Sequence, residues 1–378
     1  MGNLKLNSIY INGELVPIML INNSKVFSAI VRKIFDLSTS EIEADGETGG
    51  TYSFTITANS KWTITAPDWL TLSQNSGNGN ATITVTVPAE TGEKEGEIVV
   101  GCWSETKSIA ISTEKDYSTK YLTFKITGSG NLKWYTTTSN TSYNKTIQYS
   151  KDNGSTWSSI TSSNANSGAT ITVEAGDVVM FKGANDNYGA AYNRYTTFSG
   201  STAQFSVEGN IMSLFYGDYF SGQTSLPSNG YQLTGLFNRC TGLTSAEHLV
   251  LPATTLHNYC YGYMFYACTS LTSAPELPAT TLATYCYCEM FRNCSSLRKT
   301  PSVLPATALA YYCYYYMFNN CTQVNSIKCL ATSGINSSHS TDNWLNGVSA
   351  TGTFTKKAGA TWPTGVNGIP SGWTVLEE

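Results

Sequence analysis

The sequence predicts a mainly β protein in which two antiparallel β-sandwiches are followed by a short solenoid of repeats. β-Branched residues and glycine are abundant, whereas strong helix formers are scarce. Many short runs alternate apolar and polar residues between Gly- and Asn-rich turns, which is typical of antiparallel strands. A motif in the C-terminal third recurs at a nearly fixed period, which indicates stacked structural repeats. The length of 378 residues favours about two to four domains.

Composition argues against several classes of function. Charged residues make up 13% of the chain and the net charge is −4, so the sequence offers no basic stripe for a nucleic acid. The N-terminal segment is interrupted by Asn12-Gly13-Glu14 and Pro17, and it therefore lacks the unbroken apolar run of a signal peptide or membrane span. We expect no membrane insertion and assembly in the cytoplasm without export.

Residues 1–36 are expected to form a short apolar β adaptor. The runs "SIYING", "LVPIMLI" and "KVFSAIV" are typical of short strands joined by polar turns. A segment of this size cannot bury a core alone. We therefore expect it to pair with the next domain, a symmetry mate or a docking partner.

Residues 37–115 are predicted to form the first sandwich, of immunoglobulin-like type. Its strands are "TYSFTITA", "KWTITAP", "ATITVTVPA", "GEIVVGCW" and "TKSIAIST", separated by turn-forming stretches. Trp62, Trp69 and Trp103 have two interpretations, stacking on sugar rings or packing in the core. We favour core packing for each and keep Trp62 and Trp103 as candidate ligand-binding residues.

The stretch "ANSKWTITAPDWLTLSQNSGNGNATITVTVPAETGEKEGEIVV" resembles the BACON domain, a module of gut Bacteroidota proteins and their phages. The resemblance implies a carbohydrate-binding role, which the family's name records, or a spacer role between other modules.

Residues 116–210 repeat the β pattern and predict a second sandwich. Its strands are expected within "KYLTFKIT", "NLKWYTT", "KTIQYS", "ATITVEAGDVVMFKG" and "STAQFSVEGN".

The stretch "YSKDNGSTW", residues 149–157, resembles the Asp-box of sialidases. Asn153-Gly154 predicts a tight hairpin turn, in which Asp152 caps backbone N–H groups and Trp157 packs against the core. Sialidases carry several such boxes and bind the substrate carboxylate with an arginine cluster, whereas this chain has one box and five scattered arginines. We interpret the box as a fold device and keep a sialidase or glycosidase only as the third function.

Residues 211–340 are predicted to form the repeat solenoid. Two residue types mark its period: Phe237, Phe265, Phe291 and Phe318 lie 28, 26 and 27 residues apart, and Cys240, Cys268, Cys294 and Cys321 keep the same spacings. Such recurrence indicates stacked coils, each of which buries its neighbour's face.

The unit "MFYACTSLTSAPELPATTL" resembles the BspA-type leucine-rich repeat over residues 231–332. The resemblance implies a leucine-rich-repeat-like fold and a role in adhesion and recognition. Tyrosines that recur in register are expected to form columns in which half of the rings point inward, and we favour packing in the core or between coils for most of them. An outward column would form an aromatic strip that binds a sugar or a protein. The candidate ligand-binding tyrosines are Tyr261, Tyr263, Tyr287, Tyr314 and Tyr316.

Nine of the ten cysteines lie between Cys240 and Cys329 and recur with the repeat period. Zinc sites need paired ligands around a knuckle, so we favour buried free thiols over disulfides or a metal site. The three histidines, His248, His257 and His339, stand beside no nucleophile motif. We expect no catalytic residues, no metal and no cofactor, and hence a protein that is not an enzyme.

Residues 341–378 are a plausible cap for the last coil. The order of modules resembles virion fibre proteins of crAss-like and other Bacteroidota phages. It implies a structural and recognition protein of a phage particle, in a head or tail fibre, that is localised in the virion. Residues 1–36 would then join other virion proteins, a homotrimer is expected, and a host-surface glycan or protein would be the ligand. A bacterial surface adhesin or carbohydrate-binding protein is the alternative.

Overall fold

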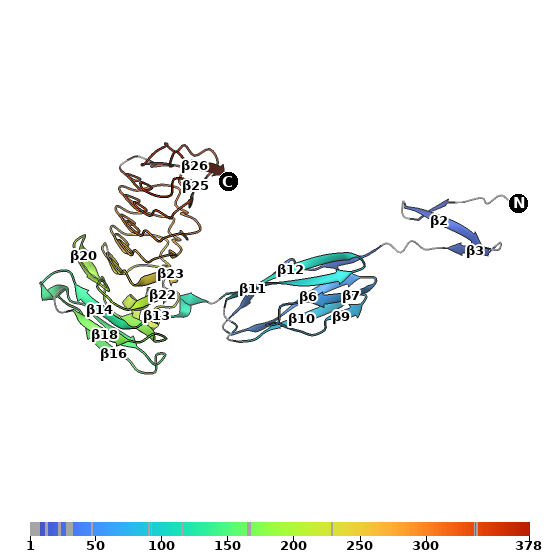
Figure 1. Ribbon diagram of the computed structural model, residues 1–378, viewed down its shortest axis with the longest axis horizontal. Coiled ribbons are helices and arrows are strands. Elements are labelled where there is room, and N and C mark those ends of the chain that lie inside the picture. The colour runs from blue at the N-terminus through green and yellow to red at the C-terminus, as the bar shows by residue number, and fades with distance from the viewer. Residues whose placement is uncertain are drawn as a thin grey trace. The chain divides into compact units, whose positions relative to one another are not determined.

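The chain is mainly β, as the sequence predicts, and divides into two compact units, Met1–Asp116 and Tyr117–Glu378 (Figure 1). The computed structural model describes residues 8–11, 14–21, 24–27, 33–46, 48–89, 91, 93–114, 116–164, 168–227, 230–335, 337 and 339–378.

Three antiparallel strands lie in the N-terminal segment. They are β1 (Ser8–Ile11), β2 (Glu14–Ile21) and β3 (Ser24–Phe27), hydrogen-bonded in that order. They coincide with the three runs that the sequence marks as strands. The residues of the intervening turns lie outside the described part of the chain, and the proposed attachment through residues 1–36 stays a prediction.

Two sheets make up the rest of the first unit. One contains, in order, β4 (Phe35–Leu37), β6 (Gly50–Ala58), β10 (Ala81–Val87) and β8 (Thr71–Leu72). The other contains β5 (Glu41–Asp45), β12 (Glu105–Glu114), β11 (Lys94–Cys102), β7 (Lys61–Thr65) and β9 (Ser76–Asn78). The five strands predicted here correspond to β6, β7, β10, β11 and β12, and every pair is antiparallel except β5 with β12.

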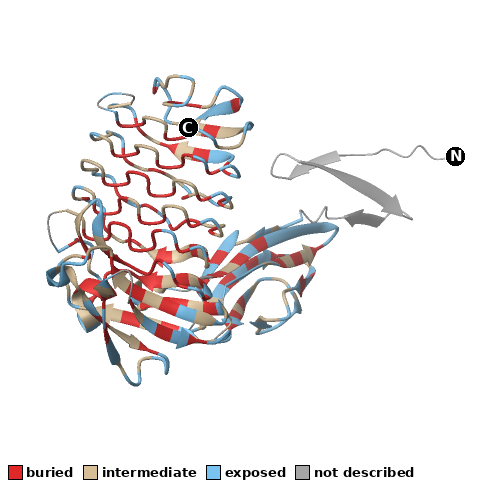
Figure 2. Ribbon diagram, turned by 60° about the vertical axis from the view of Figure 1, so that its left-hand side comes forward, coloured by how far each residue is buried: buried red, intermediate tan, exposed pale blue. Residues whose placement is uncertain are grey.

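Strict alternation of apolar and polar residues places one core between these two sheets. Along β7 the side chains of Trp62 and Ile64 are buried, whereas those of the residues between and beside them are exposed. Figure 2 shows the same alternation along the neighbouring strands. Ile83 from one sheet and Ile98 and Ile109 from the other are fully buried in a single cluster, so both sheets contribute to it.

The second unit begins with two further sheets and four short helical turns. One sheet runs β16 (Ser158–Thr161), β15 (Thr146–Ser150), β19 (Val178–Gly183), β13 (Leu122–Gly128), β22 (Gln204–Asn210) and β23 (Leu243–Val250). The other runs β17 (Ser163–Asn164), β14 (Gly130–Thr136), β21 (Arg194–Thr197) and β20 (Gly189–Ala191), with β18 (Ala169–Val173) also paired to β14. The helical turns are η1 (Tyr117–Thr119), η2 (Thr141–Tyr143), α1 (Ser213–Tyr216) and η3 (Gly217–Tyr219).

The core of these sheets continues into the repeats without a break. Strand β22 pairs in parallel with β23, which belongs to the first coil. The ring of Phe237 in that coil lies 5.9 Å from the rings of Phe124 and Phe198 in the sheets, measured between centroids. The predicted divisions at 210/211 and 340/341 therefore both fall within one continuous hydrophobic core, which extends from Leu122 to Trp373.

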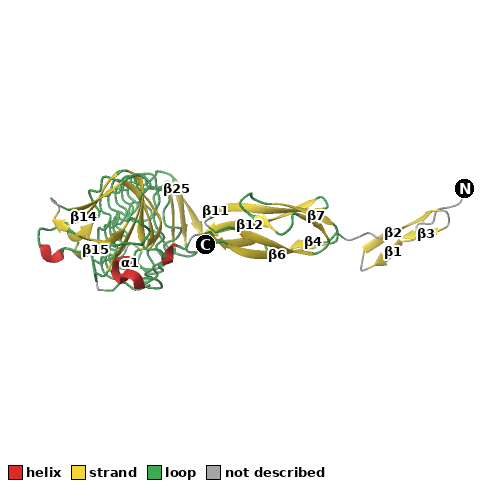
Figure 3. Cartoon of the chain, turned by 90° about the horizontal axis from the view of Figure 1, so that it is seen from below, coloured by secondary structure: helices red, strands yellow, loops and turns green. Residues whose placement is uncertain are grey.

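Each coil contains a return arm built of tandem tight turns, and these arms stack on one another. The arms are residues 231–240, 259–268, 285–294, 312–321 and 339–347. Along an arm the backbone N–H groups alternate: Met264 donates within its arm to the carbonyl of Tyr261 at 3.2 Å, and Phe265 donates to Met290 of the next arm at 2.9 Å. Figure 3 shows the arms as loops, because alternate N–H groups serve turns and not strands.

The side chains of successive arms form columns inside the stack. The buried rings of Phe237, Phe265, Phe291 and Phe318 follow one another at centroid distances of 5.4, 5.4 and 5.3 Å. The cysteine column has a polar function as well as a packing one. The thiols of Cys268, Cys294 and Cys321 donate to the carbonyls of Phe237, Phe265 and Phe291 at 3.0, 3.0 and 2.9 Å.

The segment after the last return arm closes the stack. It contributes β25 (Gly352–Lys356) and β26 (Trp373–Glu377) to a parallel sheet whose first strand, β24 (Ser326–Cys329), precedes the last arm. Asn343 of the last arm donates its N–H to the side-chain oxygen of Asn367 at 2.8 Å, and the indole N–H of Trp344 donates to the carbonyl of Gly368 at 2.9 Å. These contacts give the last arm partners that a further coil would otherwise supply.

All ten cysteines are free and buried, and this leads to a first prediction. Burial raises the pKa of the Cys294 and Cys329 thiols to about 12, so almost no thiolate forms at pH 8. We expect the native protein to react with Ellman's reagent far more slowly than the protein in guanidinium chloride, which should titrate all ten thiols. Fewer thiols in the denatured protein, without added reductant, would reveal disulfides and contradict the free-thiol assignment.

Candidate functional site

The tyrosines of the return arms form an inward and an outward column. Tyr261, Tyr287 and Tyr314 make up the inward column, and each is at most 1% exposed. Their ring centroids are 5.8 and 6.1 Å apart, and burial raises their pKa values well above the ordinary range. The prediction that these three tyrosines bind a ligand is therefore wrong, because a side chain enclosed between coils cannot reach a ligand on the surface.

The outward column is a continuous stack of five rings. Tyr231, Tyr259, Tyr285, Tyr312 and His339 follow one another at centroid distances of 4.7, 4.5, 4.6 and 4.9 Å, with interplanar angles of at most 11°. Each of the five has a positive φ between 53° and 58°. Within the column the ring faces cover one another, so a sugar could not stack on the faces between neighbours. The column therefore stiffens the surface of the coils and presents mainly ring edges and hydroxyl groups.

The other two candidate tyrosines lie in a third column. The ring of Tyr316 is covered by the guanidinium of Arg292, whose Cζ lies 4.5 Å from the ring centroid. Tyr263, two coils earlier in that column, is half-buried and lines a hollow on the surface of the second unit.

We call this hollow the tyrosine groove. It has a volume of about 400 Å³ and lies where the sheets of the second unit meet the first three return arms. Its lining residues are Tyr135, Tyr192, Asn193 and Tyr195 from the sheet side, and Asn238, Arg239, Tyr263, Tyr266 and Glu289 from the arms. Five of the nine are tyrosines, which supply apolar ring surface and hydroxyl groups together.

A glycine allows the two sides of the groove to approach. Gly235 of the first arm has a φ of +62°, and a Cβ built on it would lie 2.4 Å from a ring atom of Tyr195. Because no side chain intervenes, the ring of Tyr195 lies directly against the backbone of the arm. The next residues along the same column are Tyr263 and Glu289, which also line the groove.

The polar groups of the groove are unequally engaged. The carboxylate of Glu289, a residue only 8% exposed, accepts a hydrogen bond from Arg292 at 2.9 Å, so its charge is compensated. The guanidinium of Arg239 lies 5.8 Å above the ring of Tyr266 and has no ion pair or hydrogen bond among the described residues. The side-chain amide of Asn238 likewise has no hydrogen-bond partner in the part of the chain that the structure describes.

Two phenol groups of the groove, those of Tyr195 and Tyr263, remain protonated at neutral pH. Burial raises the pKa of Tyr195 to about 12. Burial, followed by the neighbouring Cys288 and Glu289, raises the pKa of Tyr263 still further. The hydroxyl of Tyr263 interacts with Glu289, whereas a protonated Tyr195 hydroxyl can donate a hydrogen bond to a ligand.

Sequence reasoning found one residue of the groove, Tyr263, and missed the others. The repeat period could not reveal the sheet-side residues, because these lie outside the repeats and come together with the arms only in the fold. A local signal exists in "NYGAAYNRY", residues 187–195, where tyrosine, asparagine and arginine gather in the hairpin of β20 and β21.

The tryptophans of the first unit have different surroundings. Trp62 is 2% exposed, and its indole N–H donates to the carbonyl of Gly79 at 2.8 Å. A Cβ on Gly77 would lie 2.3 Å from its ring, so Trp62 is a core residue and not a ligand-binding one. Trp103 is 43% exposed at the turn between β11 and β12, with the ammonium of Lys33 5.7 Å from its ring centroid. Trp103 thus remains accessible as a candidate.

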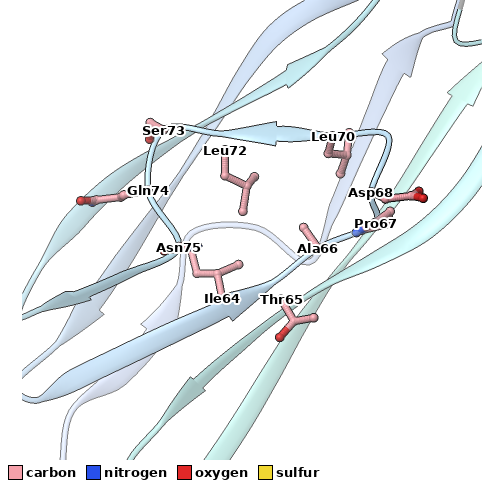
Figure 4. Close-up of a pocket in the computed structure, with 10 residues that line it drawn as sticks. All are labelled: Ile64, Thr65, Ala66, Pro67, Asp68, Leu70, Leu72, Ser73, Gln74 and Asn75. Carbon is pink, nitrogen blue, oxygen red and sulfur yellow. The ribbon is translucent and has the colours of Figure 1, made fainter.

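A second hollow, of about 610 Å³, lies in the first unit beside β7 and β8. Figure 4 shows Ile64, Leu70 and Leu72 directed into it, whereas Asp68 and Gln74 point away. No aromatic residue is among its lining residues. It therefore lacks the ring surface on which a sugar stacks.

The Asp-box has the structural role that its residues predict. Asn153 and Gly154 both have positive φ, in a turn closed by the N–H of Ser155 on the carbonyl of Asp152 at 3.2 Å. The carboxylate of Asp152 accepts hydrogen bonds from the hydroxyl of Ser150 at 2.7 Å and the N–H of Thr156 at 2.9 Å. The tight turn lies within a longer connection, since the paired residues of β15 and β16 nearest to it are Tyr149 and Ser158.

Trp157 of the same box anchors the hairpin against neighbouring strands. Its ring lies 5.1 Å from that of Tyr121, and the ammonium of Lys182 is 4.1 Å from the centroid of Trp157. The side chains of Ser150, Asp152 and Thr156 hydrogen-bond to one another within the turn, so they are not available to bind a substrate.

The described residues offer no metal site and no membrane-spanning helix. They contain no group of three or more His, Cys, Asp and Glu side chains that could hold a metal ion. No helix among them is long and apolar enough to cross a membrane. His248, in β23, stacks on Tyr117 at a centroid distance of 4.6 Å.

Comparison with known proteins identifies one segment. Residues 60–112 match the family of BACON domains, described as a putative binding domain, N-terminal, which confirms that resemblance for this part of the chain. No curated protein matches the chain. Among solved structures, a Bacteroides ovatus GH5 xyloglucanase in complex with a XXXG heptasaccharide is similar at 19% identity and a TM-score of 0.21. The likeness covers 24% of this chain and 20% of that enzyme, so the chain spans about a fifth of that enzyme's length.

The role of Asp152 can be tested by its dependence on pH. Hydrogen bonds from Thr156 and Ser150 lower the pKa of Asp152 to about 2. Because the folded-state pKa is lowered, the stabilisation is present above the ordinary value of 3.8 and is lost as the pH falls toward 2. We expect Asp152→Ala to lower the thermal midpoint by roughly 2–4 °C at pH 7, with a smaller difference near pH 2.

Glu174→Ala is the matched control for this variant. Glu174 is an exposed residue of the same unit, and its carboxylate makes no hydrogen bond or ion pair with described residues. Equal midpoints for Asp152→Ala and Glu174→Ala in calorimetry at pH 7 would contradict the turn-closing role.

Proposed function

We propose that this protein is a non-catalytic recognition protein that binds glycans in the tyrosine groove. The observation that carries the proposal is the lining of the groove, in which five tyrosines surround the unengaged side chains of Asn238 and Arg239. Tyrosine rings bury the apolar faces of sugars, and amide, guanidinium and phenol groups donate hydrogen bonds to their oxygens. The match of residues 60–112 to a putative binding domain supports a binding role for the chain as a whole.

The proposal also assigns a fold type to each set of sheets and to the coils. We assign the two-sheet part of the first unit and the first two sheets of the second to immunoglobulin-like sandwiches, and the coils to a BspA-type, leucine-rich-repeat-like solenoid. On this assignment the protein is a fibre component of a phage particle. Residues 1–36 join it to other virion proteins, and the coils carry host recognition. A bacterial surface adhesin with the same binding groove is the alternative, and isolation of the protein from purified particles or from cell envelopes would separate the two.

A hydrolytic function is not supported by the groove. Glycosidases generally use two carboxyl groups roughly 5–9.5 Å apart on either side of the scissile bond. Glu289 is the only carboxylate among the lining residues, and it is paired with Arg292. We therefore propose that the bound glycan is held and not cleaved.

Replacement of an exposed groove tyrosine tests the binding function. Tyr192 is 60% exposed, so Tyr192→Ala should leave the fold intact and remove ring surface from the groove. We expect about tenfold weaker binding to glycans selected on a glycan array, measured by titration calorimetry. Tyr219→Ala is the matched control, because Tyr219 lies in the same unit, is 84% exposed and is outside the groove.

The same titration with Trp103→Ala tests the first unit as the competing location. Normal binding by Trp103→Ala supports the groove. If Trp103→Ala abolished binding while Tyr192→Ala bound normally, the BACON segment would be the binding module and the groove assignment would be wrong.

The proposed attachment segment makes a prediction about assembly. Its strands are apolar, and surfaces of this kind are usually buried in closed symmetric oligomers. We expect multi-angle light scattering to show the full chain as a trimer and a chain of residues 37–378 as a monomer. A monomeric full chain would contradict this proposal without affecting the groove.

A further inference from the structure

The tyrosine groove contains one charge, that of Arg239, which has no ion pair with the residues that the structure describes. We propose that the groove selects glycans that carry a carboxylate, as uronic and sialic acids do, and that Arg239 binds this carboxylate. This inference rests on the proposed glycan-binding function and assigns a chemical class to its ligand.

The fold holds Arg239 at the wall of the groove by its backbone. Its N–H donates to the carbonyl of Tyr266 in the next arm at 2.7 Å, and its φ is +56°. The next residue along its column is Ala267, which is too small to cover the guanidinium from that side. The Cζ atom of the guanidinium lies 5.8 Å from the centroid of the Tyr266 ring.

The charges around the groove favour an anion over a neutral sugar. The other charged lining residue is Glu289, and Arg292 compensates its carboxylate at 2.9 Å while also lying 4.5 Å from the ring of Tyr316. The positive charge of Arg239 therefore has no carboxylate partner among the described lining residues of the groove. Arg239 is exposed, so an anion in solution can reach its guanidinium, and the positive charge attracts that anion.

Geometry favours a carboxylate among the anions. Arginine presents two parallel N–H donors that match the two oxygens of a carboxylate, and such paired bonds are among the strongest polar contacts in proteins. Asn238 adds amide donors on the same arm, next to Arg239, and is only 7% exposed. The tyrosine rings across the groove then cover the ring of the sugar that bears the carboxylate.

The experiment compares each acid with its own neutral ester. The probes are short oligosaccharides of galacturonic, glucuronic and sialic acid, each titrated beside its carboxyl-methyl ester, together with a sulfated neutral oligosaccharide. The full chain is compared with Arg239→Met, which keeps the bulk without the charge, and with Arg239→Lys. The control is Arg194→Met, because Arg194 is exposed in strand β21 but lies outside the groove.

The expected result is a preference of about tenfold for at least one acid over its ester. Arg239→Met should remove this preference by weakening the binding of the acid more than that of its ester, Arg239→Lys should retain part of it, and Arg194→Met should retain all of it. Circular dichroism would confirm that each variant keeps the wild-type melting curve.

Four outcomes would overturn the inference. Esters that bind as well as acids, or an acid preference that survives in Arg239→Met, would refute the role of Arg239 while the glycan-binding function stands. Stronger, Arg239-dependent binding of the sulfated probe would show that the ligand class is wrong. Binding of no glycan, charged or neutral, would refute the proposed function itself and this inference with it.

Discussion

The coil stack depends on the N–H groups that leave each return arm and donate to the next. Alternate N–H groups are used within an arm for tight turns, and the remainder bind the following arm, as those of Tyr261, Tyr263 and Phe265 do. This division sets the spacing between arms near that of hydrogen-bonded strands, about 4.8 Å. The outward tyrosine rings, 4.5 to 4.7 Å apart, follow this backbone spacing closely. Residues that share a position in successive arms must therefore stack, whatever their chemistry.

The same constraint explains why the groove lies where it does. The first arm has no preceding arm, so its carbonyl groups receive hydrogen bonds from the sheets: Tyr188 donates to Gln232 at 2.8 Å and Phe198 donates to Leu236 at 2.8 Å. The hairpin of β20 and β21 is thereby held against the arms, and Gly235 allows the ring of Tyr195 to lie on their backbone. The groove forms at this junction because two different kinds of surface, the sheets and the arms, meet there.

Much of the fold can be read from the sequence, because it is set by local and periodic patterns. The three N-terminal runs and the five alternating runs after them become strands, and the spacing of Phe237 and Phe265 becomes a buried stack. The inward and outward tyrosines follow from the same period, although which of them points inward depends on the positive φ of Tyr259 and Tyr263 and on the turns between them. The site is less predictable, because Tyr195 and Arg239 are 44 residues apart and neither the period nor a motif joins them. The continuity of the core across the expected boundary at 210/211 has the same origin, since β22 pairs with β23 through a connection that includes α1 and η3.

Because each arm donates hydrogen bonds to the next, the number of coils in the stack does not affect the groove. Of the five arms, the first three line the groove, together with the sheet-side residues. The closing segment contacts the last arm through Asn367 and Gly368. Between the groove and the closing segment, the N–H groups of each arm donate to carbonyl groups of the next arm. A whole coil inserted or removed after Asn293 would leave both ends with their partners, and evolution is thus free to vary the reach of this protein by duplication without disturbing what it recognises.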